Sequence, residues 1–160
     1  MIVINAGSLL EKLSHLDQST TLFLESIKGQ SLKVAIESQV EGPEDSLIRT
    51  VRLYFDSAYL PLLYCISRLN TANLSPEEYS LLTRQAMPIG RIFKYSNPGA
   101  PIVKRNTTVT IENNAHIAGC LNIKPSTVKQ KRYDYWVGER EIGTITEYFN
   151  QESLARIYVS

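Results

Sequence analysis

The sequence is poor in the residues that disulfide scaffolds, zinc sites and many reactive centres require. Its 160 residues include two cysteines, two histidines and one tryptophan. Cys65 and Cys120 are far apart and form no CxxC pair, which argues against a disulfide framework or a zinc site and fits a reduced compartment. Two histidines are few for a triad hydrolase, and no GxSxG motif is present. We therefore expect no metal site.

Longer signatures are missing as well. The chain contains no GxxxxGK[ST] and no GxGxxG motif, so no phosphate loop is indicated. No apolar run approaches the roughly 18 residues of a transmembrane helix, and the N-terminus lacks the basic region of a signal peptide. The net charge is +1, which gives no global field toward nucleic acid or an acidic membrane. We expect a cytoplasmic protein whose partner is a small molecule, with neither nucleic acid nor membrane.

What is present is typical of a globular protein. Hydrophobic residues make up 43% and charged residues 21% of the chain, both ordinary values. The length is sufficient for a real hydrophobic core, and no linker or internal repeat divides the chain. We therefore predict a single domain over residues 1–160.

Hydrophobic periodicity and capping signals predict an α+β domain with an antiparallel sheet of about six strands and helices packed on it. The best-marked helix starts at Pro76, with Ser75 as its cap and Glu78 completing a capping box. Segments 87–93 and 94–102 are expected to be connections, and 113–127 to be irregular or weakly helical. The predicted helices cover 6–16, 17–28 and 76–86, and the predicted strands cover 31–40, 47–55, 59–70, 103–112, 128–137 and 142–149.

One strand has a charge on its apolar face. Alternation along residues 47–55 places Arg49 on the same side as Leu47, Val51, Leu53 and Phe55. A guanidinium cannot give up its charge, and an unpaired charge in an apolar layer is very unfavourable. Arg49 must therefore meet an anion, which comes either from the protein or from a ligand.

The last predicted strand repeats this pattern with the opposite sign. Glu147 shares a face with Gly143, Ile145 and Phe149. One interpretation is a buried Arg49–Glu147 salt bridge, which would add little net stability because desolvation offsets the attraction. The other is a closed pocket in which Arg49 holds a ligand carboxylate and Glu147 faces a hydroxyl group. The residues alone leave both open.

Two further features receive ordinary structural interpretations. The basic cluster Lys129, Lys131 and Arg132 is interpreted as the solvated side of an edge strand, where lysines discourage aggregation, rather than as a nucleic-acid patch. His116 follows two asparagines in the irregular segment and is expected to be a solvated loop histidine.

The order of several short motifs resembles the chorismate pyruvate-lyase family. That family has an arginine-bearing strand, a following strand that starts near a proline, a P-[LI]-G-R segment and a late T-E-[LY]-F strand. The matching segments here are DQSTTLFLE, LIRTVRLYF, PLLYCISRLN, MPIGRIF and GTITEYF, which together span about residues 9–149. The resemblance implies a chorismate lyase-like fold, which the effector-binding domains of some GntR-type regulators share.

The resemblance also implies a function and a set of site residues. It implies a cofactor-independent carbon–oxygen lyase of quinone biosynthesis, which eliminates pyruvate from chorismate and leaves 4-hydroxybenzoate. Arg49 matches the arginine that grips the ring carboxylate, and Glu147 matches the catalytic carboxylate near the ring oxygen. Ile89 matches a position whose backbone contacts the ligand, and Thr20 stands where better-known bacterial members have Met. Arg68 is expected to bind the pyruvate end.

A different class of function remains open beside the enzyme. A domain of the same fold could bind a small aromatic acid as a non-catalytic sensor. A helix-turn-helix would favour the sensor, and the segment before Leu9 is too short for one. A third interpretation is a structural or partner-binding protein in which Arg49 and Glu147 form only a buried pair.

Overall fold

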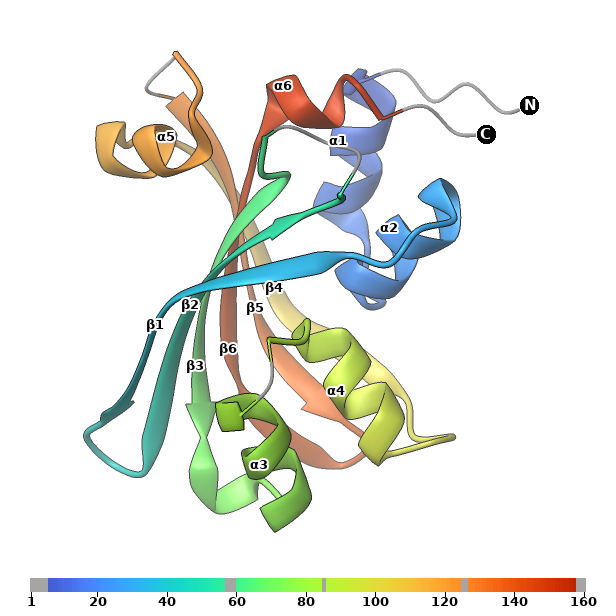
Figure 1. The fold of residues 1–160 in the computed structure, drawn as a ribbon, viewed down its shortest axis with the longest axis vertical. Coiled ribbons are helices and arrows are strands. Elements are labelled where there is room, and N and C mark those ends of the chain that lie inside the picture. Colours follow the sequence, from blue (N-terminus) through green and yellow to red (C-terminus); the bar gives the residue numbers. More distant parts are fainter. Residues whose placement is uncertain (1–5, 57–59, 85, 125–126, 158–160) are drawn as a thin grey trace.

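The fold is built on one curved antiparallel sheet with helices on both of its faces (Figure 1). The computed structural model describes residues 6–56, 60–84, 86–124 and 127–157. The strands are β1 (Lys33–Gly42), β2 (Ser46–Tyr54), β3 (Leu63–Asn70), β4 (Ile102–Asn113), β5 (Thr127–Val137) and β6 (Arg140–Phe149), in the order β1-β2-β3-β6-β5-β4. The predicted α+β class with a six-stranded antiparallel sheet is confirmed.

Six α-helices and one short 3₁₀ helix complete the described part of the chain. The helices are α1 (Ala6–His15), α2 (Thr20–Lys28), α3 (Pro76–Arg84), α4 (Ile89–Ser96), α5 (Ala115–Leu121) and α6 (Gln151–Leu154), with η1 at Thr71–Asn73. We call the sheet face that carries Arg49 and Glu147 the inner face. Helices α2 and α4 lie on this side, and α5 lies on the opposite, outer side (Figure 1).

Two apolar clusters fill the inner face, and a third fills the outer face. The first joins α1, α2 and α6 to β2 and β3 through residues such as Leu13, Leu24 and Leu154. The second joins α3 and α4 to β5 and β6, with Ile92 and Phe93 fully buried. The third lies beneath α5 on the outer face. The inner face therefore has a seam between two cores, and the site described below lies at that seam.

Predicted helix starts agree with the caps that form. The Ser19 hydroxyl accepts the Leu22 N–H at 3.3 Å at the start of α2, and Gly29 ends this helix with φ of 70°. At α3, Ser75 and Glu78 form the predicted capping box, with hydrogen bonds of 2.8 and 3.1 Å. These bonds satisfy N–H groups that a helix cannot pair internally.

The connection predicted over residues 87–102 is wrong in part, because it contains α4. Pro88 precedes the first helical residue, and one side of the helix buries Ile92 and Phe93. Proline is tolerated at a helix start because its missing N–H would be unpaired there anyway. The weakly helical segment 113–127 contains α5, which Asn114 caps by accepting the Ile117 N–H at 3.0 Å.

Two strand predictions also need correction. Strict alternation along the predicted strand 31–40 puts Val40 on the same face as Leu32 and Val34. The register of β1 against β2 shifts between Ile36 and Ser38, so Val40 lies on the other face and is 53% exposed. A bulge of this kind adds one residue to a strand and inverts the alternation beyond it. Strand β5 is not an edge strand, since β6 and β4 flank it, and its Lys131 is buried rather than solvated.

The turn predicted at 56–58 and the start of the strand predicted at 59 fall partly on residues 57–59, which lie outside the described ranges.

A buried carboxylate joins α3 to the β5–β6 hairpin and to the end of α4. Glu78 is fully buried and accepts hydrogen bonds from Arg140 at 2.8 and 2.9 Å and from the Asn97 amide at 2.7 Å. Burial alone would raise the pKa of Glu78, but the hydrogen bonds from Arg140, Ser75 and Asn97 outweigh it and lower the pKa to about 2.

Substituting Glu78→Gln is expected to lower the free energy of unfolding at neutral pH by about 3 kcal/mol, because it leaves Arg140 without its charge partner. The folded-state pKa of about 2 lies below the ordinary 4.5, so this stabilisation is complete above about pH 4.5 and is lost as the pH falls toward 2. Urea unfolding of both proteins across this range should therefore give curves that converge in acid. A constant difference between them would contradict this assignment.

Candidate functional site

The strand register brings the two predicted site residues into adjacent rows of the inner face. Arg49 pairs with Ser67, which pairs with Ile145, which in turn pairs with Tyr133. The next row contains, in order across the sheet, Val51, Cys65, Glu147 and Lys131. Strands distant in sequence thus place Arg49 and Glu147 on one surface, as the alternation predicted.

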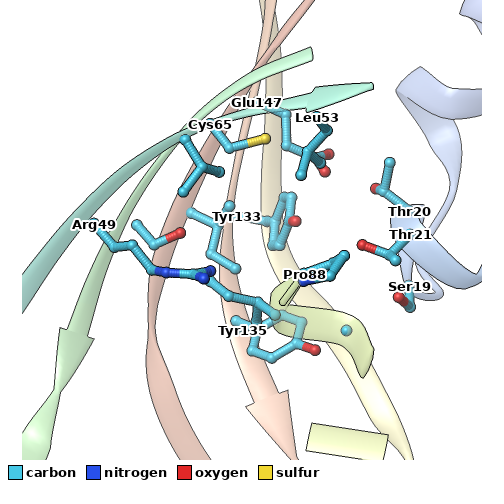
Figure 2. Close-up of a pocket in the computed structure, with 15 residues that line it drawn as sticks. Ser19, Thr20, Thr21, Arg49, Leu53, Cys65, Pro88, Tyr133, Tyr135 and Glu147 are labelled. Atoms are coloured by element: carbon cyan, nitrogen blue, oxygen red, sulfur yellow. The ribbon is translucent and has the colours of Figure 1, made fainter. Parts of the chain in front are cut away.

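A cavity lies over these two rows, at the seam between the two inner-face cores (Figure 2). It is a small cavity, in which about 40 Å³ is open to the centre of a water molecule. Side chains of the sheet form its floor, and the starts of α2 and α4 line it on the helix side. The residues that line it from the helix side are Ser19, Thr20, Thr21, Pro88, Ile89 and Gly90.

Arg49 is buried in this cavity with most of its hydrogen-bonding capacity unused. The side chain is 1% exposed, and Nη2 donates to the Met87 carbonyl at 2.7 Å. Within the described ranges Nε and Nη1 have no hydrogen-bond partner, and no carboxylate lies within 4.0 Å of the guanidinium. Burial lowers the pKa of Arg49 to about 10, which still leaves the group charged at neutral pH.

Glu147 pairs with a lysine and not with Arg49. Its side chain is 4% exposed, and the Lys104 Nζ lies 3.7 Å from Oε1. This oxygen accepts no hydrogen bond from the described residues. The interpretation of Arg49 and Glu147 as a buried salt bridge is therefore not what the structure shows, and Arg49 remains without an anion.

Two buried lysines surround the carboxylate and connect it to the N-terminal helices. The Lys104 Nζ donates to the Thr20 hydroxyl at 2.5 Å and lies 4.6 Å from the centre of the Tyr133 ring. The Lys131 Nζ donates to the carbonyls of Leu13 and Leu16, at the end of α1. Burial and the neighbouring Lys104 lower the pKa of Lys131 to about 8. Three buried cations thus accompany one buried carboxylate, and the region is electropositive.

The first turns of α2 and α4 add further positive potential. The first N–H groups of a helix have no intrahelical partner, and they carry the positive end of the helix dipole. Thr20 and Thr21 begin α2, while Ile89 and Gly90 begin α4, and all four line the cavity. Two helix starts that converge with an arginine form an environment suited to an anionic group.

Gly90 allows the two helix starts to meet. A Cβ atom at this position would lie 2.2 Å from the Ser19 hydroxyl and 3.2 Å from the Thr21 Cβ. Gly90 does not have a positive φ, so the close approach to α2 is what requires glycine here. Nearby, the Arg91 guanidinium pairs with Glu25 of α2 and donates to the Leu32 carbonyl at 3.2 Å. Helices α2 and α4 are therefore joined directly at the cavity.

The remaining titratable groups of the cavity are neutral. Burial raises the pKa of Cys65, Tyr133 and Tyr135, and the nearby charge of Glu147 raises all three further. A protonated thiol is a poor nucleophile, and neutral phenols are hydrogen-bond donors. In the described part of the chain no three His, Cys, Asp or Glu side chains gather as metal ligands. The arrangement is suited to holding an anion.

Four of the five predicted site residues line the cavity: Arg49, Glu147, Thr20 and Ile89. The fifth, Arg68, pairs with Ile48 and Thr144 on the outer face and is exposed. Its expected role at a ligand is corrected, because successive strand residues point to opposite faces and Arg68 lies next to the inner-facing Ser67.

Sequence reasoning missed Lys104, Lys131 and Tyr133. Alternation along β5 places Lys131 and Tyr133 on one face of that strand. Had β5 been recognised as the neighbour of β6, this face would have been identified as the inner face that carries Glu147. The bond from Lys104 to Thr20 joins residues 84 positions apart and has no local signal.

The chain matches no family model and no curated protein, but solved structures resemble it. The ligand-binding domain of a GntR-family regulator from Bordetella bronchiseptica has a TM-score of 0.58 at 15% identity, over 76% of this chain and 87% of that one. The transcriptional regulator YydK from Bacillus subtilis has a TM-score of 0.62 at 12% sequence identity, over 95% of this chain and 78% of that one. The effector domain of PhnF from Mycobacterium smegmatis has a TM-score of 0.58 at 12% sequence identity, over 84% of this chain and 90% of that one. The chain has the fold of GntR-family effector domains.

The prediction of a chorismate pyruvate-lyase is wrong. The similar structures named above are transcriptional regulators or domains of regulators, and they give no support to chorismate, lyase activity or quinone biosynthesis. The predicted chorismate lyase-like fold is confirmed, because these effector domains share it.

Two expectations about partners concern nucleic acid and membranes. The exclusion of nucleic acid has no support, since the similar structures come from transcriptional regulators. Across residues 6–56, 60–84, 86–124 and 127–157, no helix is long and apolar enough to cross a membrane.

Substituting Arg49→Met is expected to raise the free energy of unfolding of the ligand-free protein by about 2 kcal/mol, because it removes an unpaired buried charge and keeps a side chain of similar length. Chemical denaturation measures this change. Arg52→Met on the same strand is the control, since Arg52 faces outward and pairs with Glu37 at 2.8 Å; it should change stability by less than about 1 kcal/mol. A large loss of stability in Arg49→Met would instead indicate that Arg49 has a buried partner.

Substituting Gly90→Ala is expected to destabilise the protein by about 1–2 kcal/mol, because the new methyl group must displace the Ser19 cap. Gly119→Ala is the matched control, since Gly119 lies in α5 with nothing within 4 Å of its Cβ position. Alanine should stabilise that helix by up to about 1 kcal/mol. Thermal unfolding of both variants checks the comparison, and equal changes would show that the Gly90 contact is unimportant.

Proposed function

We propose that this chain is a ligand-sensing effector domain that binds a small molecule through an anionic group held by Arg49. The observation that supports this proposal is the buried guanidinium with two unused nitrogens, Nε and Nη1, in a cavity lined by the starts of α2 and α4. An anion there would receive the two donors that the described residues leave unpaired, and it would offset the desolvated charge.

Sensing accounts for the cavity without any reactive group. The thiol and the phenols are neutral, and the resemblance is to effector domains of regulators. The buried lysines also offer a route for a signal. Lys104 contacts Thr20 at the start of α2, and Lys131 holds the end of α1. An anion beside Thr20 would compete for Lys104 and so change how α1 and α2 are held against the sheet.

The other cavity residues are assigned by their chemistry. Glu147 Oε1, which accepts no bond from the described residues, would accept a hydroxyl or N–H group of the ligand. Thr20 would contribute its hydroxyl, and Ile89 its free backbone N–H at the start of α4. Phosphate and carboxylate groups both suit these donors. The aromatic acid expected from the sequence belongs to the second class, with its carboxylate on Arg49.

Titration of the purified protein with inorganic phosphate, sulfate and 4-hydroxybenzoate, followed by calorimetry and thermal unfolding, tests this proposal and distinguishes the two anion classes. At 100 times Kd a ligand should stabilise the protein by about 2.7 kcal/mol. The wild type and Arg52→Met should bind the same anion with equal affinity, and Arg49→Met should lose at least 100-fold.

Binding that survives unchanged in Arg49→Met would contradict the assigned site. A failure of every probe to bind or stabilise the wild type would contradict anion binding as the function of the cavity.

A further inference from the structure

A second, larger cavity adjoins the first. This second cavity is a groove with a volume of about 710 Å³ open to the centre of a water molecule, compared with about 40 Å³ in the inner cavity. The groove lies between the body of α2, the end of α4 and the start of β4. Ser19 lines both cavities, so one residue forms the boundary between them.

The two cavities follow the same two helices. The inner cavity lies at their first residues, with Thr20 and Thr21 on α2 and Ile89 and Gly90 on α4. The groove continues along them, past Phe23 on α2 and Lys94 on α4. Helices α2 and α4 lie on the same side of the sheet (Figure 1). A molecule whose charged end occupied the inner cavity would therefore have the groove next to it.

We infer that the ligand of this domain has two parts: a compact anionic head at Arg49 and an extended tail in the groove between α2 and β4. The inference rests on the proposed function and adds the shape of the ligand to it. The inner cavity is by far the smaller of the two, so a ligand too large for it would extend into the space that adjoins it. The adjoining groove is the large cavity that shares a wall with it.

The lining of the groove indicates the chemistry of this tail. Half-buried Leu22 and Phe23 on α2 and half-buried Ile102 and Val103 on β4 present apolar surface. Gln18 and Lys94 are exposed and polar. A tail with one apolar face and a polar edge matches this lining, since the face would be removed from water and the edge would remain hydrated.

The test compares the affinities of a small and a large probe that carry the same head group. If the protein prefers phosphate in the titration above, the small probe is methyl phosphate and the large probe is phenyl phosphate. If it prefers carboxylate, the small probe is acetate and the large probe is 4-phenylbutyrate. The larger probe should bind about tenfold more tightly or better, because its ring is buried in the groove.

Ser26→Trp blocks the groove without altering the inner cavity. Ser26 is an exposed residue of α2 that lines the groove, and its hydroxyl bonds only to the Phe23 carbonyl among the described contacts. Ser31→Trp is the matched control, because Ser31 is exposed and lines neither cavity. The first substitution should remove the advantage of the larger probe while leaving the affinity for the smaller one unchanged, and the second should change neither.

Two results would overturn the inference while leaving the proposed function in place: equal affinities for the two probes in the wild type, or an advantage of the larger probe that persists in Ser26→Trp. Loss of binding of both probes in Arg49→Met shows that the head occupies the inner cavity. If neither probe binds the wild type, both the proposed function and this inference fail.

Discussion

The structure depends on a guanidinium that is removed from water without receiving a counter-ion. Arg49 lies in the middle of β2, on the inner face of the sheet, and its single bond to the Met87 carbonyl leaves most of its donor capacity unused. Such a group is unfavourable in a folded protein unless something else balances it. The carboxylate that could have balanced it, Glu147, pairs with Lys104 on the other side of the cavity. Stability is thus given up at one position, which is typical of a site that is completed by a ligand.

The neighbouring elements are arranged consistently with this constraint. The inner face has two cores rather than one, and their seam leaves room above Arg49. Helices α2 and α4 meet above the seam because Gly90 has no side chain to separate them. Their unpaired N–H groups, together with Lys104 and Lys131 behind the cavity, add to the positive potential of the arginine. The same lysines contact the end of α1 and the start of α2, so the N-terminal helices are held to the sheet by groups beside the cavity.

Much of this arrangement could be predicted from local patterns. Alternation in two strands identified Arg49 and Glu147 as charges on an apolar face, and the register confirms that both face inward. The capping signal at Ser75 placed the start of α3 correctly, whereas α2 begins at Thr20 instead of residue 17. The six strands and their antiparallel pairing followed from periodicity and turn residues.

The errors arose where long-range contacts decide the outcome. Lys131 was taken for a solvated residue because strand order is not encoded locally, and β5 lies inside the sheet. Helix α4 was missed because its eight residues follow a proline and are stabilised by burial of Ile92 and Phe93. Val40 was assigned to the wrong face because a bulge in β1 is invisible to a strict alternation. The function was mistaken because enzymes and regulator domains share this fold, and the shared motifs describe the fold rather than the chemistry.

The most direct test of this account is to observe the Arg49 guanidinium itself. In ¹⁵N–¹H NMR spectra, the Nε–H signal of Arg49 should shift and become protected from exchange with water as phosphate or 4-hydroxybenzoate is added. The corresponding signal of Arg52, on the outer face, should remain unchanged in the same titration. An Arg49 signal that stays constant while another part of the protein responds to the anion would contradict the claim that this arginine is reserved for a ligand.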